Sequence, residues 1–209
     1  MSTTTTPPIS RSPESGTRRV ITRAAAGLGV LLGLGVLSYQ LTETVLGDDG
    51  GAELVVVQDV PADVRAELDV TWARFTDRFE ARTSCIGTVS LELVRDVEGG
   101  DARYVHRRAR IEIEIPTTPA RFRESVVHEL AHHVEHTCPD FEQLRDELHP
   151  RWGGPDRPWT GGDVWAEIPS EMWAEAVVEL VNGERIRHAD EIVVDPQVVE
   201  LIVAWSSTG

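Results

Sequence analysis

The stretch that most constrains this chain is a run of helical period that begins near residue 119 and contains two histidines four positions apart. Thr118 can cap such a helix, and Pro119 suits its first turn. At 100° per residue, His128, Glu129 and His132 fall on one face. Apolar side chains fall on nearly the opposite face, at Val127, Leu130, Ala131 and Val134. The sequence therefore predicts a long helix that packs on one side and lines a cleft on the other.

The polar face of this helix carries an HExxH sequence whose histidines are His128 and His132. Residues four apart on a helix lie about 6 Å apart on one side, so both imidazoles can bind one Zn²⁺ at about 2.0–2.1 Å. Nitrogen ligands favour zinc over calcium, which prefers oxygen. Glu129 lies beside them and can act as general base towards a water activated by the ion. His133 points to another side, and His136 lies roughly 12 Å along the axis from His128.

A catalytic zinc site needs a third protein ligand and an open position. The metzincin continuation requires Gly at position 135 and His at position 138, but this chain has Glu135 and Cys138 there. The best source of the ligand is a later helix with the sequence SEMWAEA, which places Glu171 and Glu175 on one side. We expect Glu171 to be the ligand. Glu175, and Asp163 after a Gly-Gly pair, are the alternatives, and a surface carboxylate is the simpler interpretation of Glu171.

The pairing of HELAH with SEMWAEA resembles the gluzincin-type zinc metallopeptidases. The resemblance is greatest to the catalytic domain of the anthrax lethal factor type, and it covers the two helices. It implies a zincin-like fold and one zinc ion held by His128, His132 and Glu171. It also implies that Glu175 accepts a hydrogen bond from a ligand histidine and orients it.

One departure from that family concerns the group that stabilises the developing oxyanion. The family has a tyrosine shortly before the ligand helix, whereas this chain has none there, and Tyr104 is the only tyrosine of the expected domain. Tyr104, His149 or an arginine from another element can supply the donor. The sequence predicts metal binding without identifying this group.

The rest of the pattern predicts an α+β fold with a small mixed sheet in residues 53–209. Helices are expected after Pro61, at 141–149, at 170–181 and after Pro196, and a strand at 89–93. The run Arg110–Ile115 alternates, with apolar side chains on one face and acids on the other. It directly precedes the HExxH helix, as zincin edge strands do, and can pair with an extended peptide. An ordinary sheet strand is the alternative.

The beginning of the chain has the composition of an export segment. Residues 1–19 are rich in Thr, Ser and Pro and are expected to form a disordered cytoplasmic terminus. Arginines then precede a largely apolar segment at 20–46, expected to be a signal anchor or a signal peptide, and they direct the rest of the chain across the membrane. Continuation through Val45 and Leu46 brings the segment to spanning length. Residues 47–52 are expected to be a linker.

The net charge of the chain limits the kinds of molecule that we expect it to bind. The net charge is −15, and the basic N-terminal segment makes the remainder more acidic still. An acidic domain repels a phosphate backbone, so we expect no nucleic-acid partner. All basic residues are arginine, which is typical of a GC-rich bacterial genome.

Cys85 and Cys138 are the only cysteines. If the domain is exported, we expect them to form a disulfide, which contributes roughly 4 kcal/mol on the chain-entropy model. Two buried free thiols are the alternative. The bridge would join the end of the HExxH helix to the segment before the strand at 89–93.

Together these features predict a zinc-dependent enzyme that hydrolyses peptide bonds of protein or peptide substrates outside the cytoplasmic membrane, either anchored or secreted after cleavage. The alternative is a zinc-stabilised, catalytically inactive binding module of the cell envelope. A third interpretation is an exported structural protein without metal. The sequence leaves open the cleavage site, any activator and the oligomeric state.

Overall fold

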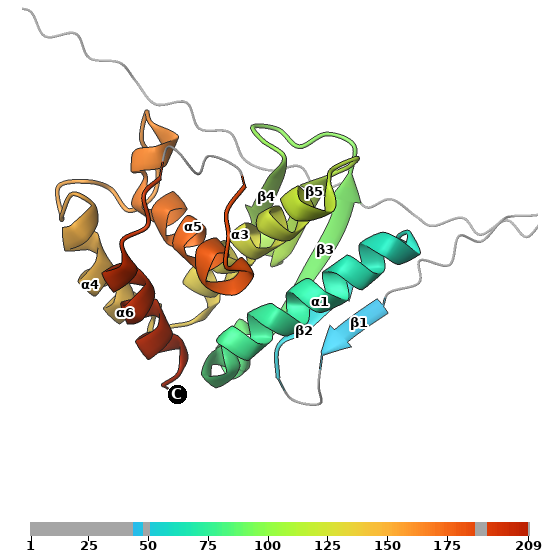
Figure 1. The fold of residues 1–209 in the computed structure, drawn as a ribbon, viewed down its shortest axis with the longest axis horizontal. Helices are drawn as coiled ribbons and strands as arrows, with labels where there is room; N and C mark the ends of the chain where they lie inside the picture. Colours follow the sequence, from blue (N-terminus) through green and yellow to red (C-terminus); the bar gives the residue numbers. More distant parts are fainter. Residues whose placement is uncertain (1–43, 48–50, 187–191, 209) are drawn as a thin grey trace, which may run out of the picture. The chain divides into compact units, whose positions relative to one another are not determined.

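The computed structural model describes residues 44–47, 51–186 and 192–208, all within one compact unit (Figure 1). The fold is α+β, with a small mixed sheet packed against helices. The strands are β1 (Thr44–Gly47), β2 (Glu53–Val56), β3 (Thr88–Val94), β4 (Ala102–Val105) and β5 (Arg110–Glu114). The helices are α1 (Ala62–Arg78), α2 (Thr83–Ile86), α3 (Pro119–Thr137), α4 (Phe141–Leu148), α5 (Pro169–Asn182) and α6 (Pro196–Ser206).

The sheet has the strand order β1-β2-β3-β5-β4. Strands β2, β3 and β5 are parallel, and the outer strands β1 and β4 are antiparallel to their neighbours. Strand β5 is therefore paired on both sides, so the expectation that Arg110–Ile115 forms an edge is wrong and the alternative of an ordinary sheet strand is correct. Strand β4 occupies the edge position next to β5. The chain passes from β4 to β5 through a tight turn in which Ala109 has a φ of 45°.

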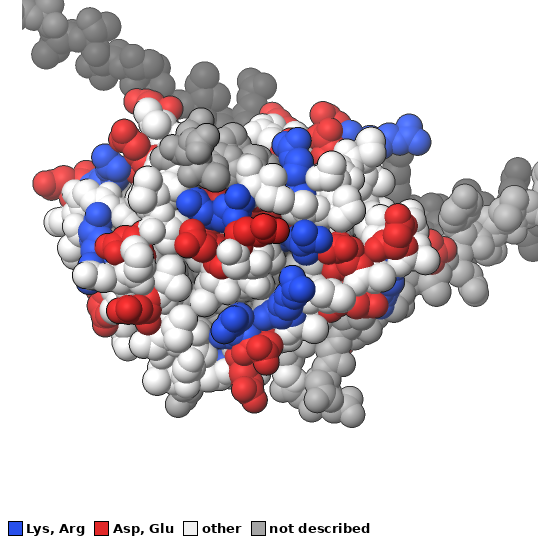
Figure 2. All heavy atoms as spheres, in the orientation of Figure 1, with Lys and Arg blue, Asp and Glu red and all other residues white. Residues whose placement is uncertain are grey.

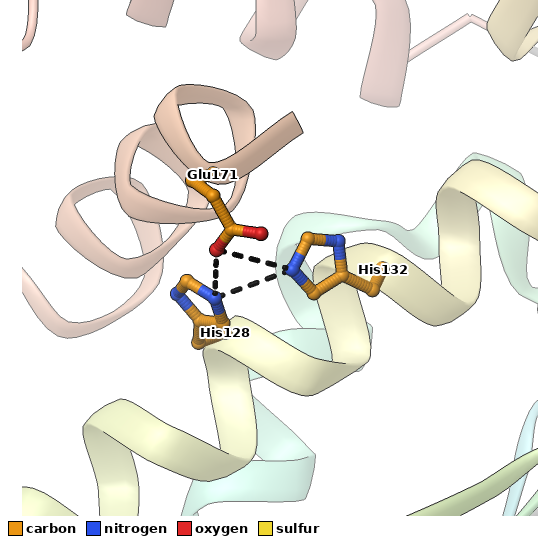
Figure 3. A group of neighbouring side chains, drawn as sticks. All are labelled: His128, His132 and Glu171. Atoms are coloured by element: carbon orange, nitrogen blue, oxygen red, sulfur yellow. Dashed lines mark hydrogen bonds and ion pairs between the residues drawn. The ribbon is translucent and has the colours of Figure 1, made fainter. Parts of the chain in front are cut away.

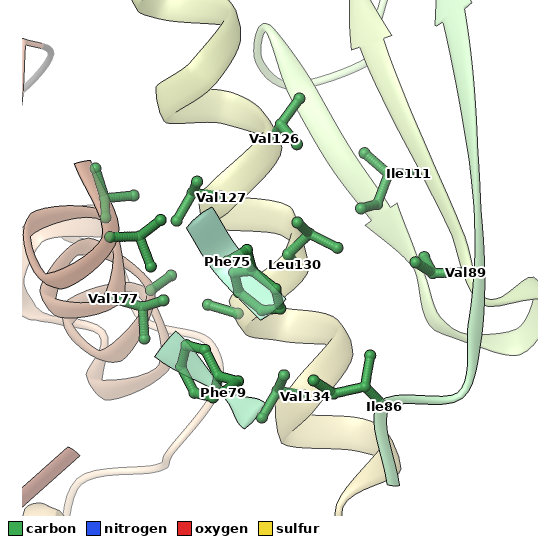
Figure 4. Packing of buried hydrophobic residues seen from close by; sticks show 14 of the residues in the cluster. Phe75, Phe79, Ile86, Val89, Ile111, Val126, Val127, Leu130, Val134 and Val177 are labelled. Carbon is green, nitrogen blue, oxygen red and sulfur yellow. The ribbon is translucent and has the colours of Figure 1, made fainter. Parts of the chain in front are cut away.

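Helix α3 is enclosed between the sheet and α5. Figure 4 shows Val126 of α3 beside Ile111 of the sheet, and Val127 of α3 towards Val177 of α5. All four side chains are fully buried. Burial of a side chain of this size contributes about 1.5–3 kcal/mol, so this packing holds the helix firmly. The predicted apolar face is confirmed, because its members are all buried: Val127, Leu130, Ala131 and Val134.

The outer face of the sheet carries the charges expected from the alternating pattern of β5. Glu112 is only 6% exposed and accepts hydrogen bonds from Arg103, at 2.7 Å, and from Arg110. Arg110 also donates to Glu92 of β3, at 2.8 Å. The bonds from Arg103 of β4 and from Arg110 of the same strand satisfy a buried acid that would otherwise destabilise the sheet.

The helix predictions are confirmed by α1, α3, α4, α5 and α6. In α3 the Thr118 hydroxyl accepts the backbone N–H of Arg121 at 3.3 Å, and Pro119 occupies the first turn. The strand prediction at 89–93 is confirmed by β3. Strands β2 and β4 were not predicted, because each has four residues, too few for a periodic pattern to stand out.

The domain begins earlier than predicted. Thr44–Gly47 forms β1 and pairs with β2, so the ends assigned to the segment 20–46 and to the linker 47–52 overlap the sheet. The rest of the predicted N-terminal segments lies outside the described residues, apart from the end of the linker at 51–52. Among the helices of the described residues, each is too short or too polar to cross a bilayer.

The predicted disulfide is confirmed. Cys85 in α2 and Cys138 at the end of α3 are bonded, with their Cα atoms 4.9 Å apart. The bridge fixes the C-terminal end of α3 against the segment that leads into β3.

Candidate metal centre

Three of the predicted site residues converge on one point. His128 and His132 project from α3, and Glu171 projects towards them from α5 (Figure 3). His128 Nε2 lies 3.0 Å from Glu171 Oε2, and His132 Nε2 lies 3.6 Å from the same oxygen. The two Nε2 atoms are 3.2 Å apart. These three side chains form a cluster that could hold a metal ion.

The imidazole of His128 is oriented from its other nitrogen. Its Nδ1 lies 3.0 Å from Glu175 Oε1, which matches the orienting role expected for Glu175. Glu175 is 4% exposed, and Arg185 lies 3.5 Å from its second oxygen. Arg185 also donates to the Ile192 carbonyl at 2.7 Å. Since Glu175 contacts Nδ1, it leaves Nε2 to face the cluster and is not placed as the third donor.

The imidazole of His132 has a corresponding carboxylate that the sequence analysis missed. Its Nδ1 lies 3.5 Å from Glu135 Oε2, within the same helix. The other oxygen of Glu135 accepts the indole N–H of Trp159 at 2.8 Å. The three-residue spacing of His132 and Glu135 could have indicated this pair, because such residues are neighbours on a helix. The contact with Trp159 had no comparable signal.

The electrostatics of the cluster tie the three groups together. Burial opposes the charged forms of both histidines, but hydrogen bonds to Glu171 and to Glu175 or Glu135 outweigh it and raise the pKa of both imidazoles. Burial likewise opposes the charge of Glu171, but its bonds to the two imidazoles hold the pKa of that carboxyl well below its usual range. The carboxylates and the imidazoles therefore favour one another's charged forms.

Glu129 lies in the same cleft but outside the donor cluster. Its side chain is largely buried, and burial raises the pKa of its carboxyl against the opposing charges of His128 and His132. The backbone N–H of Tyr104, in the edge strand β4, also interacts with this carboxyl. A carboxyl group with a raised pKa beside a cluster that could hold a metal ion is suited to accepting and returning a proton.

The candidates for an oxyanion donor are engaged elsewhere. The Tyr104 hydroxyl donates to His133 Nδ1 at 2.8 Å, and burial raises the pKa of that phenol to about 12. His149 donates from Nε2 to the Arg157 carbonyl at 2.7 Å. Arg103 lines the cleft but is paired with an acid of the sheet.

Two other residues considered from the sequence lie outside the donor cluster, although His136 is among the residues that line the cleft. Asp163 is exposed and is not among the residues that line the cleft. His136 is exposed, and its ring stacks on His106 with centroids 5.2 Å apart. The alternative of Asp163 as third ligand is therefore not supported by the geometry.

The cleft itself has a volume of about 690 Å³ and is lined by the cluster, Glu129 and the residues from Ala102 to Tyr104 of the edge strand β4. Comparisons with models of known protein families and with curated proteins found no match to this chain.

Proposed function

We propose that this protein is a zinc-dependent peptidase. The observation that carries the proposal is the convergence of His128, His132 and Glu171 in a cleft that also holds the buried Glu129. Zinc hydrolases can hold their ion with two imidazoles and one carboxylate. A second carboxylate beside these ligands can then act as the base.

The spacing of the donors supports zinc. Tetrahedral ligands at about 2.0–2.1 Å from zinc are separated from one another by about 3.3–3.4 Å. The separations among the three donor atoms are 3.0, 3.2 and 3.6 Å, on either side of that value. The set therefore fits one ion, and three protein donors leave a fourth position for water or substrate.

The protein's own residues then have distinct tasks. Zinc bound at this cluster would lower the pKa of a water towards 7 and polarise a substrate carbonyl. Glu175 and Glu135 hold Nδ1 of the two histidines and direct Nε2 into the cleft. Glu129 accepts the proton of the attacking water and returns it to the leaving amine, a role that its raised pKa suits.

A peptide substrate is supported by the edge strand β4. In the described part of the sheet, β4 pairs with β5 on one side, and its residues from Ala102 to Tyr104 line the cleft. An extended peptide can add to such an edge through main-chain hydrogen bonds. This assigns to β4 the substrate role expected of Arg110–Ile115. On the face shown in Figure 2, arginine and acidic side chains are interspersed.

We further propose that the domain works outside the cytoplasmic membrane of a bacterium, anchored by the N-terminal segment or secreted. The Cys85–Cys138 disulfide supports this location, because disulfides persist in oxidising compartments and are rare in the cytosol.

Metal content and turnover together test the function. Wild-type protein should contain one zinc per chain, Glu171→Ala should lose most of it, and a diverse peptide library should be cleaved by wild type alone. Glu129→Gln should keep its zinc and lose hydrolysis by about 10²–10⁴-fold. Equal turnover by Glu129→Gln and wild type would sink the assignment of the base.

The rival proposal is a zinc-stabilised binding module of the cell envelope. It is favoured by the hydrogen bonds that Tyr104, His149 and Arg103 make to other groups, because these bonds occupy the candidate oxyanion donors. That module would hold zinc in wild type and cleave nothing in the library. Zinc far below one per chain would overturn both proposals and support a metal-free structural protein.

A further inference from the structure

One aromatic residue contacts two of the three donor groups. The Trp165 indole N–H donates to Glu171 Oε2 at 3.0 Å, the same oxygen that faces both imidazoles. The Trp165 ring also stacks on His128, with centroids 6.2 Å apart and planes 20° apart. Trp165 lines the cleft and is half-buried, so it lies at the wall of the centre rather than in the core.

We infer that Trp165 is a positioning residue of the metal centre, which orients the Glu171 carboxylate through its N–H and restrains the His128 imidazole through its ring. The inference rests on the proposed zinc site. It concerns how the site is held in shape and not which bond is cleaved.

The need for such a group follows from side-chain freedom. The last torsion of a glutamate is broad and roughly two-fold, so packing alone does not fix which way its oxygens point. Among the described residues, three groups contact the Glu171 carboxylate as donors: the two histidines and the Trp165 indole N–H. The histidines give up their Nε2 protons when they ligate, so Trp165 is the donor that can persist in the loaded site.

The backbone around Trp165 is rigidly joined to the ligand helix. Trp165 begins a 3₁₀ turn, and its carbonyl accepts the N–H of Ile168, the residue that precedes α5, at 3.1 Å. The Ile168 carbonyl in turn accepts the N–H of Glu171 at 3.0 Å. Arg157 donates to the Glu167 carbonyl at 2.9 Å and holds the turn from outside. Donor and acceptor are thus fixed within one short segment.

The chain offers a matched control in Trp205 of α6. Its Nε1 is buried and has no hydrogen-bond partner among the described residues, so Trp205→Phe removes an indole N–H without removing such a bond. Its ring packs against Phe79, Phe141 and Trp173, away from the donors. Trp165→Phe makes the same chemical change at the centre while keeping an aromatic ring beside His128.

The test measures zinc affinity by competition with a chelating dye in the full-length protein. We expect Trp165→Phe to bind zinc about tenfold or more weakly, the usual effect of losing a group that orients a ligand. Trp205→Phe should bind like wild type. The Co²⁺ absorption bands should shift in Trp165→Phe alone, and the melting temperature of metal-free Trp165→Phe should match that of metal-free wild type.

Two results would overturn the inference. One is equal zinc affinity in Trp165→Phe and wild type, and the other is weaker binding explained by an equal loss of stability in the metal-free protein. Zinc-loaded wild type that cleaves no peptide would overturn the proposed hydrolysis and leave the role of Trp165 standing. The two failures are therefore distinguishable.

Discussion

His132 and His133 are neighbours in α3 and have opposite environments. His132 Nε2 faces His128 and Glu171 in the cleft, and its other nitrogen faces a carboxylate. His133 is fully buried, accepts the Tyr104 hydroxyl at Nδ1 and donates from Nε2 to the Ile86 carbonyl at 2.8 Å. One imidazole belongs to a candidate metal site, and the other links β4, α3 and the end of α2.

The partners of each ring, and not the residue type, set the direction in which its pKa shifts. Carboxylates outweigh burial and raise the pKa of His132 to about 10 in the metal-free protein, whereas burial with neutral partners lowers the pKa of His133. His132 therefore stabilises the metal-free fold below its unfolded pKa and loses that effect as pH rises through 10. His133 stabilises the fold above its unfolded pKa and loses that effect as pH falls through its folded value.

The largest effect should come from removing the cleft-facing ring. His132→Ala removes one of three donors, so we expect bound zinc to fall from one per chain to a small fraction and hydrolysis to be lost with it. Metal analysis after dialysis measures this. His136→Ala, which removes an exposed histidine of the same helix, should keep its zinc. Equal metal content in wild type and His132→Ala would remove the basis of the comparison.

Removing the buried ring should affect stability instead. His133→Ala deletes a buried side chain and leaves the Tyr104 hydroxyl and the Ile86 carbonyl without their partner, which costs about 2–4 kcal/mol. Urea unfolding of the metal-free protein measures the loss. The folded fraction should still bind one zinc per chain, and a folded His133→Ala protein without zinc would contradict the separation of roles.

The carboxylates that orient the ligands should matter unequally. Glu175→Gln keeps an acceptor for His128 Nδ1 but loses its charge, so zinc should bind about tenfold more weakly. Glu135→Gln should have a smaller effect, because Glu135 lies 3.5 Å from its histidine whereas Glu175 lies 3.0 Å from His128. Competition titrations of both variants compare them, and a larger effect in Glu135→Gln would reverse this order.

The smallest signal should be proton release. In the metal-free protein the pKa of His128 is raised to about 9 and that of His132 to about 10, while zinc needs neutral imidazoles. Zinc binding at pH 8 should therefore release at least one proton, and affinity should rise with pH towards those values. A pH indicator in weakly buffered solution measures the release. If no proton is released at pH 8, the carboxylates do not keep the imidazoles of His128 and His132 protonated.

The sequence by itself determined what depends on local geometry. The four-residue spacing of His128 and His132 and the apolar face of α3 follow from the period of a helix, and so does the pairing of Glu171 with Glu175 on α5. These features were predicted without knowledge of the fold, and the structure brings His128, His132 and Glu171 together. The cysteine pair could likewise be expected once export was inferred.

Only the tertiary structure decided the features that depend on contacts across the chain. The alternation of apolar and polar residues in one strand does not determine the order of strands in the sheet. The pattern of Arg110–Ile115 therefore could not show that β4 would pair with the free side of β5. The contacts of Trp159 with Glu135 and of Arg185 with Glu175 depend on how loops return to the helices. The periodicity of a helix or strand determines which of its residues share a face. The residues that pack against that face are determined by the packing of the whole domain.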